Sequence, residues 1–166
     1  MSLSSSAAYR CFLAVFGKTR EWVLALNFVA LVYYHNAPVV FVSLGACLCG
    51  VVAKLLKLVI RQERPARKHG RRQSYGMPSS HSAGMGYYAT LIPMLLADCG
   101  GGLACTLAAT LLLGALGAGG ALYRAASGHH TLAQVAAGVV VGWAVARAWW
   151  LCRGPVLQSI ESVLHG

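Results

Sequence analysis

Five apolar stretches separated by short polar breaks are the strongest constraint on how this chain folds. They run roughly over residues 22–34, 38–60, 82–97, 103–123 and 131–151. A helix needs about 20 mostly apolar residues to cross the hydrocarbon core of a bilayer. Hydrophobic residues make up 57% of the sequence and charged residues only 11%. The pattern therefore predicts an all-α, polytopic transmembrane helical bundle with about five spans.

The sequence predicts three parts. Residues 1–20 form an N-terminal arm, whose apolar portion over residues 7–17 is too short to span a bilayer and suits the membrane interface. Residues 21–152 form the transmembrane domain, and residues 153–166 form a C-terminal tail. The opening residues lack a cationic leader followed by a cleavable apolar core. We therefore expect the first span to act as the anchor.

The charged residues are few and strongly unbalanced. Fourteen basic residues against four acidic ones give a formal net charge of +10, which in a soluble protein would raise the question of nucleic-acid binding. Here the basic residues gather in the N-terminal arm and over residues 54–72, and the rest of the chain is almost uncharged. We therefore discount nucleic acid as a partner. We expect an integral membrane protein that binds a phosphate-bearing lipid or an anionic membrane surface.

Cysteine and glycine indicate packing rather than chemistry. The sequence has no CxxC pair and no Cys/His spacing typical of zinc. We interpret the cysteines as buried small hydrophobes, with a disulfide near the span ends left open: Cys11, Cys47, Cys49, Cys99, Cys105 and Cys152. Glycines in the last two stretches offer small surfaces for close helix contact: Gly114, Gly117, Gly119, Gly120, Gly138 and Gly142.

Short polar breaks predict that neighbouring stretches are antiparallel helices. Residues 35–38 separate the first two stretches, and residues 98–102 separate the third from the fourth. Both breaks are rich in residues that favour turns. This topology brings the end of the second stretch, the start of the third, the end of the fourth and the start of the fifth to one face. Three polar clusters lie at these four points.

The first cluster is Lys57 with Arg64 and Pro65, at the end of the second stretch. Seven residues make about two helical turns, so the two cations can point the same way, and Pro65 prevents the helix from continuing without a kink. Two cations near one point suit a phosphate. The alternative is a positively charged helix end beside lipid headgroups.

The second cluster runs from Tyr75 to His81, directly before the third stretch. Pro78, Ser79 and Ser80 favour a helix start, whose N–H groups and dipole form an anion site. A histidine in the first helical turn is suited to donating a proton, because its ordinary pKa lies near neutrality. The alternative is a capped helix with an interfacial histidine.

The third cluster, which joins the fourth stretch to the fifth, contains Arg124, His130 and Gln134. These side chains can bind a phosphoryl group, attack it and orient the attacking imidazole. Each also has a simpler interpretation, since Arg124 can snorkel and His129 is a neighbouring histidine without an assigned role. Three basic clusters and two histidines on one face favour chemistry. The other polar residues show no partner pattern and are assigned to solvated surface: Asp98, Arg153, Glu161 and His165.

In order and internal spacing, the clusters resemble the three signature motifs of the type 2 phosphatidic-acid phosphatase superfamily: Lys57-x6-Arg64-Pro65, Pro78-Ser79-Ser80-His81 and Arg124-x5-His130. The resemblance covers roughly residues 50–142. Ser80 stands where the superfamily commonly has glycine, and Gln134 where it commonly has the aspartate that orients the nucleophile. With these departures, Tyr75–Ser82 and His130–Val135 resemble the eukaryotic dolichyl diphosphate phosphatases.

The resemblance implies a mechanism without a metal or other cofactor. His130 would attack the terminal phosphorus to give a phosphohistidine. His81 would protonate the departing oxygen and then deprotonate water, and Gln134 would orient His130 without the charge of a carboxylate. Cationic side chains and helix N–H groups would hold the phosphate oxygens: Lys57, Arg64, Arg124 and the N–H groups around Ser79 and Ser80.

The same resemblance implies that a polyprenyl diphosphate, dolichyl diphosphate, is hydrolysed to the monophosphate. The site would face the lumen of the endoplasmic reticulum, where the lipid carrier of protein N-glycosylation is recycled. The positive-inside rule favours the cytoplasmic side, because Arg10, Lys18, Arg20 and the loop over residues 61–72 lie on the face of the motifs. We expect the lumenal site, since several of these charges can serve a diphosphate headgroup.

Two alternatives stay open. One is a phosphatase of the same superfamily for phosphatidate, a sphingoid phosphate or another isoprenoid diphosphate. The other is an inactive membrane scaffold or small transporter that keeps the fold. The intact histidines and cations of the three motifs argue against the scaffold.

Overall fold

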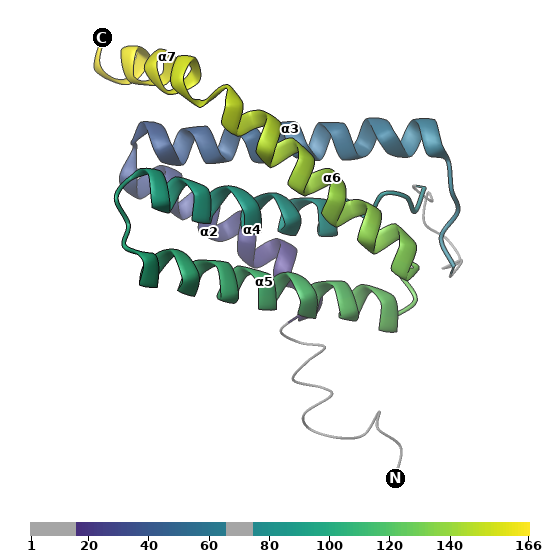
Figure 1. The fold of residues 1–166 in the computed structure, drawn as a ribbon. Coiled ribbons are helices and arrows are strands. Elements are labelled where there is room, and N and C mark those ends of the chain that lie inside the picture. Colours follow the sequence, from purple (N-terminus) through teal and green to yellow (C-terminus); the bar gives the residue numbers. More distant parts are fainter. Residues whose placement is uncertain (1–15, 66–74) are drawn as a thin grey trace.

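The computed structural model describes residues 16–65 and 75–166, which form an all-helical bundle (Figure 1). Its helices are α2 (Thr19–Tyr34), α3 (Ala37–Ile60), α4 (Ser80–Asp98), α5 (Leu103–Ala126), α6 (Leu132–Leu151) and α7 (Arg153–His165). The five apolar stretches correspond to α2 through α6, with ends that differ by at most a few residues. The predicted all-α fold is therefore confirmed.

Side chains in the polar breaks determine where three helices begin. Asn36 is the N-cap of α3, and its side chain accepts a hydrogen bond from a first-turn N–H at 3.1 Å. Ser79 is the N-cap of α4, as the serine pair predicts. At α6, Thr131 and Gln134 form a capping box, each side chain accepting a hydrogen bond from the other residue's N–H at 3.2 Å. These bonds satisfy N–H groups that have no partner within the helix.

Helix α4 lies inside the bundle, between α3 and α5 and against α6 (Figure 1). Its most extensive packing is with α6, where two glycines allow the backbones to approach closely. A Cβ atom added at Gly142 would meet the carbonyl oxygen of Ala83, and one added at Gly138 would meet that of Ser79. The small surfaces predicted at these two glycines are confirmed.

Among the described residues, three helices are long and apolar enough to cross a membrane: α3, α5 and α6, each with an 18-residue stretch whose mean hydropathy is 2.3, 1.7 and 1.4, respectively. The predicted first span, α2, is an apolar helix of 16 residues. The predicted third span, α4, is enclosed by other helices and has buried serine, tyrosine and proline side chains. A helix that contacts protein rather than lipid on most sides needs less hydrophobicity.

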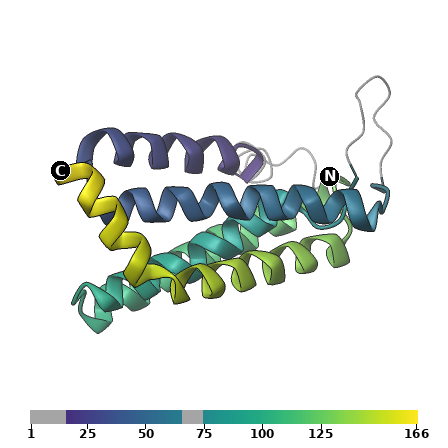
Figure 2. The ribbon, with the colours of Figure 1, turned by 90° about the horizontal axis from the view of Figure 1, so that it is seen from above.

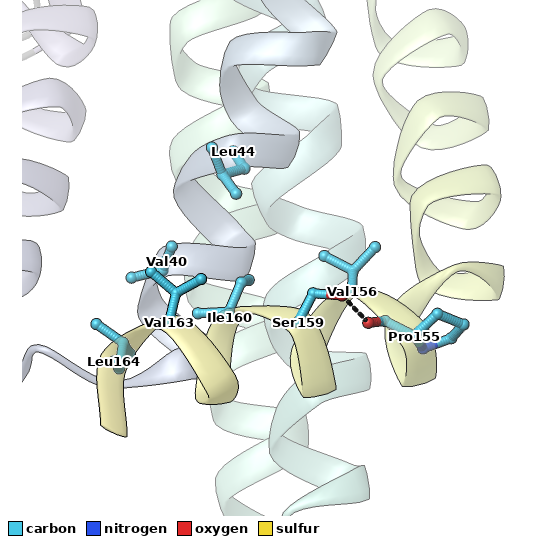
Figure 3. Close-up of a pocket in the computed structure, with 8 residues that line it drawn as sticks. All are labelled: Val40, Leu44, Pro155, Val156, Ser159, Ile160, Val163 and Leu164. Atoms are coloured by element: carbon cyan, nitrogen blue, oxygen red, sulfur yellow. Dashed lines mark hydrogen bonds between the residues drawn. The ribbon is translucent and has the colours of Figure 1, made fainter. Parts of the chain in front are cut away.

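The predicted C-terminal tail forms the helix α7, which runs across the end of the bundle where α3 begins (Figure 2). Arg153, its first residue, lies 3.5 Å from the carboxylate of Asp98 and 4.5 Å from the ring centre of Trp150. Both side chains are solvent-accessible, as their assignment to surface predicts, but the expectation that they have no partner is wrong. An apolar groove of about 500 Å³ separates α7 from the start of α3 (Figure 3), lined by Val40, Leu44, Pro155, Val156, Ser159, Ile160, Val163 and Leu164.

The interpretation of the cysteines as buried is largely wrong. All five cysteines in the described residues are free thiols. Cys49 is buried, and the other four are exposed at the bundle surface: Cys47, Cys99, Cys105 and Cys152. Gly114 likewise faces open space, with no atom within 4 Å of an added Cβ. Residues that face lipid are as apolar as residues that face the core, so an apolar stretch does not reveal which side of a helix is buried.

Three sequence predictions concern residues outside the described part of the chain. These are most of the N-terminal interfacial arm, the side chains of Arg10 and Cys11 within it, and most of the basic loop over residues 61–72.

Candidate active site

The polar clusters meet at one end of the bundle, as the antiparallel topology predicts. The end of α3, the start of α4, the end of α5 and the start of α6 lie together there (Figure 1). They surround a cavity of about 450 Å³. Its polar lining, within the part of the chain that the structure describes, contains cations, histidines and hydroxyl groups but no carboxylate: Lys54, Lys57, Arg64, Ser80, His81, Tyr88, Arg124 and His130. Such a lining suits an anionic group.

His130 and Gln134 form the central contact of the site. His130 lies between α5 and α6, where its N–H donates to the carbonyl oxygen of Arg124 at 3.2 Å. Its ring is buried, with 4% of the residue exposed, and Nδ1 lies 3.1 Å from Oε1 of Gln134. Gln134 is fully buried in the first turn of α6. The α6 capping box therefore also orients the imidazole.

The orientation of the Gln134 amide determines the tautomer of His130. Gln134 Nε2 donates to the carbonyl oxygen of Glu63 at 2.8 Å and to Oε1 of Gln62 at 3.2 Å. Its Oε1 already accepts from the N–H of Thr131 at 3.2 Å. The atom facing His130 is therefore an acceptor, and Nδ1 of His130 must carry the hydrogen. In the neutral ring, the lone pair is then on Nε2.

The surroundings of His130 favour its neutral form. Burial, together with the nearby charges of Arg64, Lys57 and Arg124, lowers the pKa of His130 from 6.5 to about 4, while the hydrogen bond to Gln134 opposes the shift. Desolvation and like charge both disfavour a second proton on the ring. At neutral pH the imidazole is therefore uncharged, which is the form that can act as a nucleophile.

Lys57 and Arg64 reach the cavity by different routes. Lys57 lies in the last turn of α3 and is buried. The helix ends at Ile60, and Arg61 follows in a left-handed conformation with its N–H bonded to the carbonyl oxygen of Lys57. Arg64 is therefore on the segment after the helix, so the prediction that two helical turns align the two cations is wrong. Tertiary bonds hold this segment, including the one from Gln134 to Glu63.

Ser79 and Ser80 differ in their contacts. The N–H of Ser79 donates to the carbonyl oxygen of Gln134 at 2.9 Å, and its hydroxyl accepts from the N–H and hydroxyl of Ser82 at 3.4 and 3.0 Å. Ser79 is fully buried and does not line the cavity, whereas Ser80 does. Of the two serines predicted to bind phosphate, Ser80 has the position for direct contact, and Ser79 joins α4 to α6.

His81 lines the cavity from the first turn of α4 and contacts α2. Its Nε2 lies 2.9 Å from Oγ1 of Thr19. The Thr19 hydroxyl donates its hydrogen to the carbonyl oxygen of Phe16 at 3.1 Å, so Oγ1 is the acceptor for the His81 N–H. Gly120 permits this arrangement, because an added Cβ would lie 3.0 Å from Nε2 of His81.

Several residues of the site were not predicted from the sequence. Lys54 lines the cavity one turn before Lys57, and its spacing of three residues on an apolar helix is a detectable signal. Thr19 and Gln62 carry no such signal, because their contacts with His81 and Gln134 join distant parts of the chain. His129 does not line the cavity; its Nδ1 lies 2.6 Å from Ser127 Oγ.

The described residues contain no group of three or more His, Cys, Asp or Glu side chains arranged to hold a metal ion. The chemistry available from the chain itself is a neutral imidazole that lines the cavity, a second histidine and several cations around the same cavity. Such an arrangement can attack an electrophilic centre that bears negative oxygens and can stabilise those oxygens.

Two known proteins have sequences similar to that of this chain. The chain is 25% identical over 151 residues to lipid phosphate phosphatase epsilon 2, chloroplastic, from Arabidopsis thaliana, covering 90% of this chain and 52% of the relative. It is 29% identical over 133 residues to dolichyldiphosphatase 1 from Dictyostelium discoideum, covering 76% of this chain and 58% of the relative. The chain thus spans little more than half the length of each.

A solved structure has the same fold. It is a transmembrane PAP2-type phosphatidylglycerolphosphate phosphatase from Bacillus subtilis, with a TM-score of 0.69 and 16% sequence identity over 85% of this chain and 74% of that one. The family model of the PAP2 superfamily matches residues 38–157. That range includes α3 to α6 and every residue of the cavity except those contributed by α2. The chain is a multi-pass membrane protein and belongs to the PAP2 superfamily.

Proposed function

We propose that this protein is a membrane lipid phosphatase that hydrolyses dolichyl diphosphate, or another polyprenyl diphosphate, to the monophosphate through a phosphohistidine on His130. The observation that carries the proposal is the geometry of His130. It is buried and neutral, its Nδ1 is bonded to Gln134 at 3.1 Å, and it lines a cavity with three motif cations and His81.

In the first step, Nε2 of His130 attacks the terminal phosphorus, and the bond from phosphorus to the bridging oxygen breaks. His81 gives a proton to that oxygen, so the polyprenyl monophosphate leaves. Lys57, Arg64 and Arg124 stabilise the equatorial oxygens, together with the N–H of Ser80 at the start of α4. Positioning and charge supply most of the catalysis, as in other phosphoryl transfers.

In the second step, His81 takes a proton from a water molecule, which attacks the phosphorus of the phosphohistidine. The bond to Nε2 breaks and inorganic phosphate leaves, restoring the neutral imidazole. Gln134 accepts a hydrogen bond from His130 throughout both steps, and its own two N–H bonds keep it in that orientation. No net charge is placed behind the ring, because glutamine is neutral.

Two features support a diphosphate substrate on a polyprenyl chain. The motifs from Tyr75 to Ser82 and from His130 to Val135 resemble dolichyl diphosphate phosphatases, and a relative at 29% identity bears the name dolichyldiphosphatase. A phosphate monoester has a charge of about −1.5 to −2 at pH 7. The cationic side chains that line the cavity carry more positive charge than one such group requires. We accordingly propose an endoplasmic reticulum location, a lumenal site and a role in recycling the N-glycosylation carrier.

A second candidate is hydrolysis of a lipid phosphate monoester. The name of the Arabidopsis relative, a lipid phosphate phosphatase aligned over 90% of this chain, favours it. Both candidates use the same cavity and the same nucleophile, and they differ only in the headgroup and the lipid.

The test is phosphate release by the protein purified in detergent, with a metal chelator present. Dolichyl diphosphate is compared with phosphatidate and farnesyl diphosphate, using wild type and His130→Ala. Preferred release from dolichyl diphosphate that is lost in His130→Ala supports the proposal. Preference for phosphatidate would replace the substrate and keep the mechanism, and inactivity on all three lipids would leave the inactive scaffold as the better account.

A further inference from the structure

The geometry points to Lys54 as the residue that binds the second, lipid-proximal phosphate of a lipid diphosphate and thereby sets a preference for diphosphates over monophosphates. The inference rests on the proposed function, because it concerns the headgroup that occupies the same cavity. It adds a subsite that the three motifs do not contain, since Lys54 precedes the first motif residue, Lys57.

Lys54 and Lys57 line the same cavity from one face of α3. Residues three apart on an α-helix point in similar directions and are separated by about 4.5 Å along the axis. Lys57 lies in the last turn, so Lys54 lies farther from the polar end of the helix and deeper in the predicted span. The two lysines are therefore attached to α3 at two successive depths.

The cavity that Lys54 lines has both polar and apolar lining residues. Arg64, Arg124 and His130 come from helix ends: Arg64 follows α3, Arg124 is in the last turn of α5 and His130 precedes α6. The rest of the wall is formed by side chains of α2 and α4 and small residues, including Val23, Leu24 and Met85. A lipid diphosphate combines the same kinds of chemistry, with a terminal phosphate, then a second phosphate, then a hydrocarbon chain. Lys54 lines this cavity one helical turn farther from the polar end of α3 than Lys57 does.

A lysine at this depth is costly for the protein. Within α3 the only charged residues are Lys54 and Lys57, and an 18-residue stretch of the helix has a mean hydropathy of 2.3. Ionisable residues inside membrane spans are expensive and usually mark a ligand or ion site. The simpler explanation is that the exposed side chain of Lys54 snorkels to the headgroup region. The two explanations differ in one measurable respect, because snorkelling gives no preference for a headgroup.

Lys54 also suits the proposed chemistry. When the bridging bond breaks, negative charge develops on the bridging oxygen and remains on the departing monophosphate. An ammonium group beside that phosphate binds the substrate and stabilises the leaving group, whereas a monophosphate substrate has no group in this position. Removal of the charge should therefore affect the two headgroups unequally.

The experiment measures inhibition constants against farnesyl diphosphate hydrolysis for a matched pair of non-hydrolysable lipids, farnesyl methylenediphosphonate and farnesyl phosphonate. For Lys54→Gln, we expect the constant for the diphosphonate to rise by about tenfold or more and that for the phosphonate to change by less than about twofold. Lys54→Arg should restore most of the difference. Arg61→Gln is the control, because Arg61 is an exposed cation at the end of α3 that does not line the cavity.

Equal losses for both inhibitors, or no change for either, would overturn the assignment of Lys54. If Lys54→Gln does not elute as a monodisperse protein in detergent, Lys54→Met is measured in the same way, with the same two outcomes. A wild type that hydrolyses no lipid diphosphate would remove the proposed function and this inference together. If hydrolysis depends on His130 but the ratio of the two inhibition constants is the same in Lys54→Gln as in wild type, only this inference fails.

Discussion

Nδ1 of His130 lies 3.1 Å from Oε1 of Gln134, and the amide of Gln134 is held in that orientation by its own bonds to Glu63 and Gln62. The chain after α3 is thus linked through one buried glutamine to the imidazole before α6. This relationship makes Nδ1 the donor, and it does so without a negative charge beside the ring. The following predictions concern this contact and its neighbours.

Replacement of Gln134 by Glu should raise the pKa of His130. A carboxylate at 3 Å favours the charged form of an imidazole, in contrast to the neutral amide oxygen. We expect the titration midpoint to rise by about one unit or more relative to wild type. The measurement is the titration of ¹⁵N-labelled histidine by NMR in detergent, with the resonance assigned by its absence in His130→Ala. A lower or unchanged midpoint would contradict the role given to this contact.

The wild-type imidazole of His130 should remain neutral well below the usual histidine range. Burial lowers its pKa to about 4, so the deprotonated, nucleophilic form is complete above about pH 5 and is lost only as the pH falls through 4. The same NMR titration measures this value. A midpoint for His130 near 6.5 would show that the site is more open to water.

Protein stability should depend on the same group. The pKa of His130 is lower in the folded state than its ordinary value of 6.5, so the unfolded chain binds more protons between about pH 4 and 6.5. The contribution of His130 to the free energy of unfolding is therefore fully present above pH 6.5 and decreases as the pH falls toward 4. Thermal unfolding in detergent should show a smaller decline over this interval in His130→Phe. An identical decline in both proteins would assign the effect to other groups.

Thr19 should position His81. In Thr19→Val, the acceptor for the His81 N–H at 2.9 Å is removed while the side-chain volume is nearly kept. We expect kcat to fall by about tenfold with little change in KM, because general acid catalysis typically supplies about 10² to 10⁴ and depends on geometry. Thr19→Ser retains the hydroxyl and should retain kcat. Unchanged kcat in Thr19→Val, or an equal loss in both variants, would contradict the role given to the hydrogen bond.

Gly142 should be essential for the contact between α4 and α6. A Cβ there would meet the carbonyl oxygen of Ala83, whereas a Cβ at Gly114 would have open space. Gly142→Ala should therefore lower the free energy of unfolding by about 1–3 kcal/mol or more, and Gly114→Ala, the matched control, should be neutral or slightly stabilising. The readout is the temperature at which the detergent-solubilised protein loses its monodisperse elution. Similar temperatures for the two variants would refute the close approach of these helices.

Much of the fold and part of the site could be predicted from the sequence, because both depend on local chemistry. Apolar length indicates a helix such as α3 (Ala37–Ile60), and Ser79 and Thr131 are the kind of residue that caps a helix start. Antiparallel connections then bring the ends that carry Lys57, His81, Arg124 and His130 to one cavity. These relationships need no knowledge of which helix face packs against which.

The tertiary structure alone decided the contacts between distant segments. The path of Arg64 outside the helix, the bond from Thr19 to His81 and the orientation of Gln134 depend on how neighbouring helices and loops pack. The burial of Cys49 and the exposure of Cys47 also could not be predicted. The physical reason is that lipid and protein interior both favour apolar side chains, so hydrophobicity determines the length of a helix in a membrane and leaves the direction of each side chain to packing.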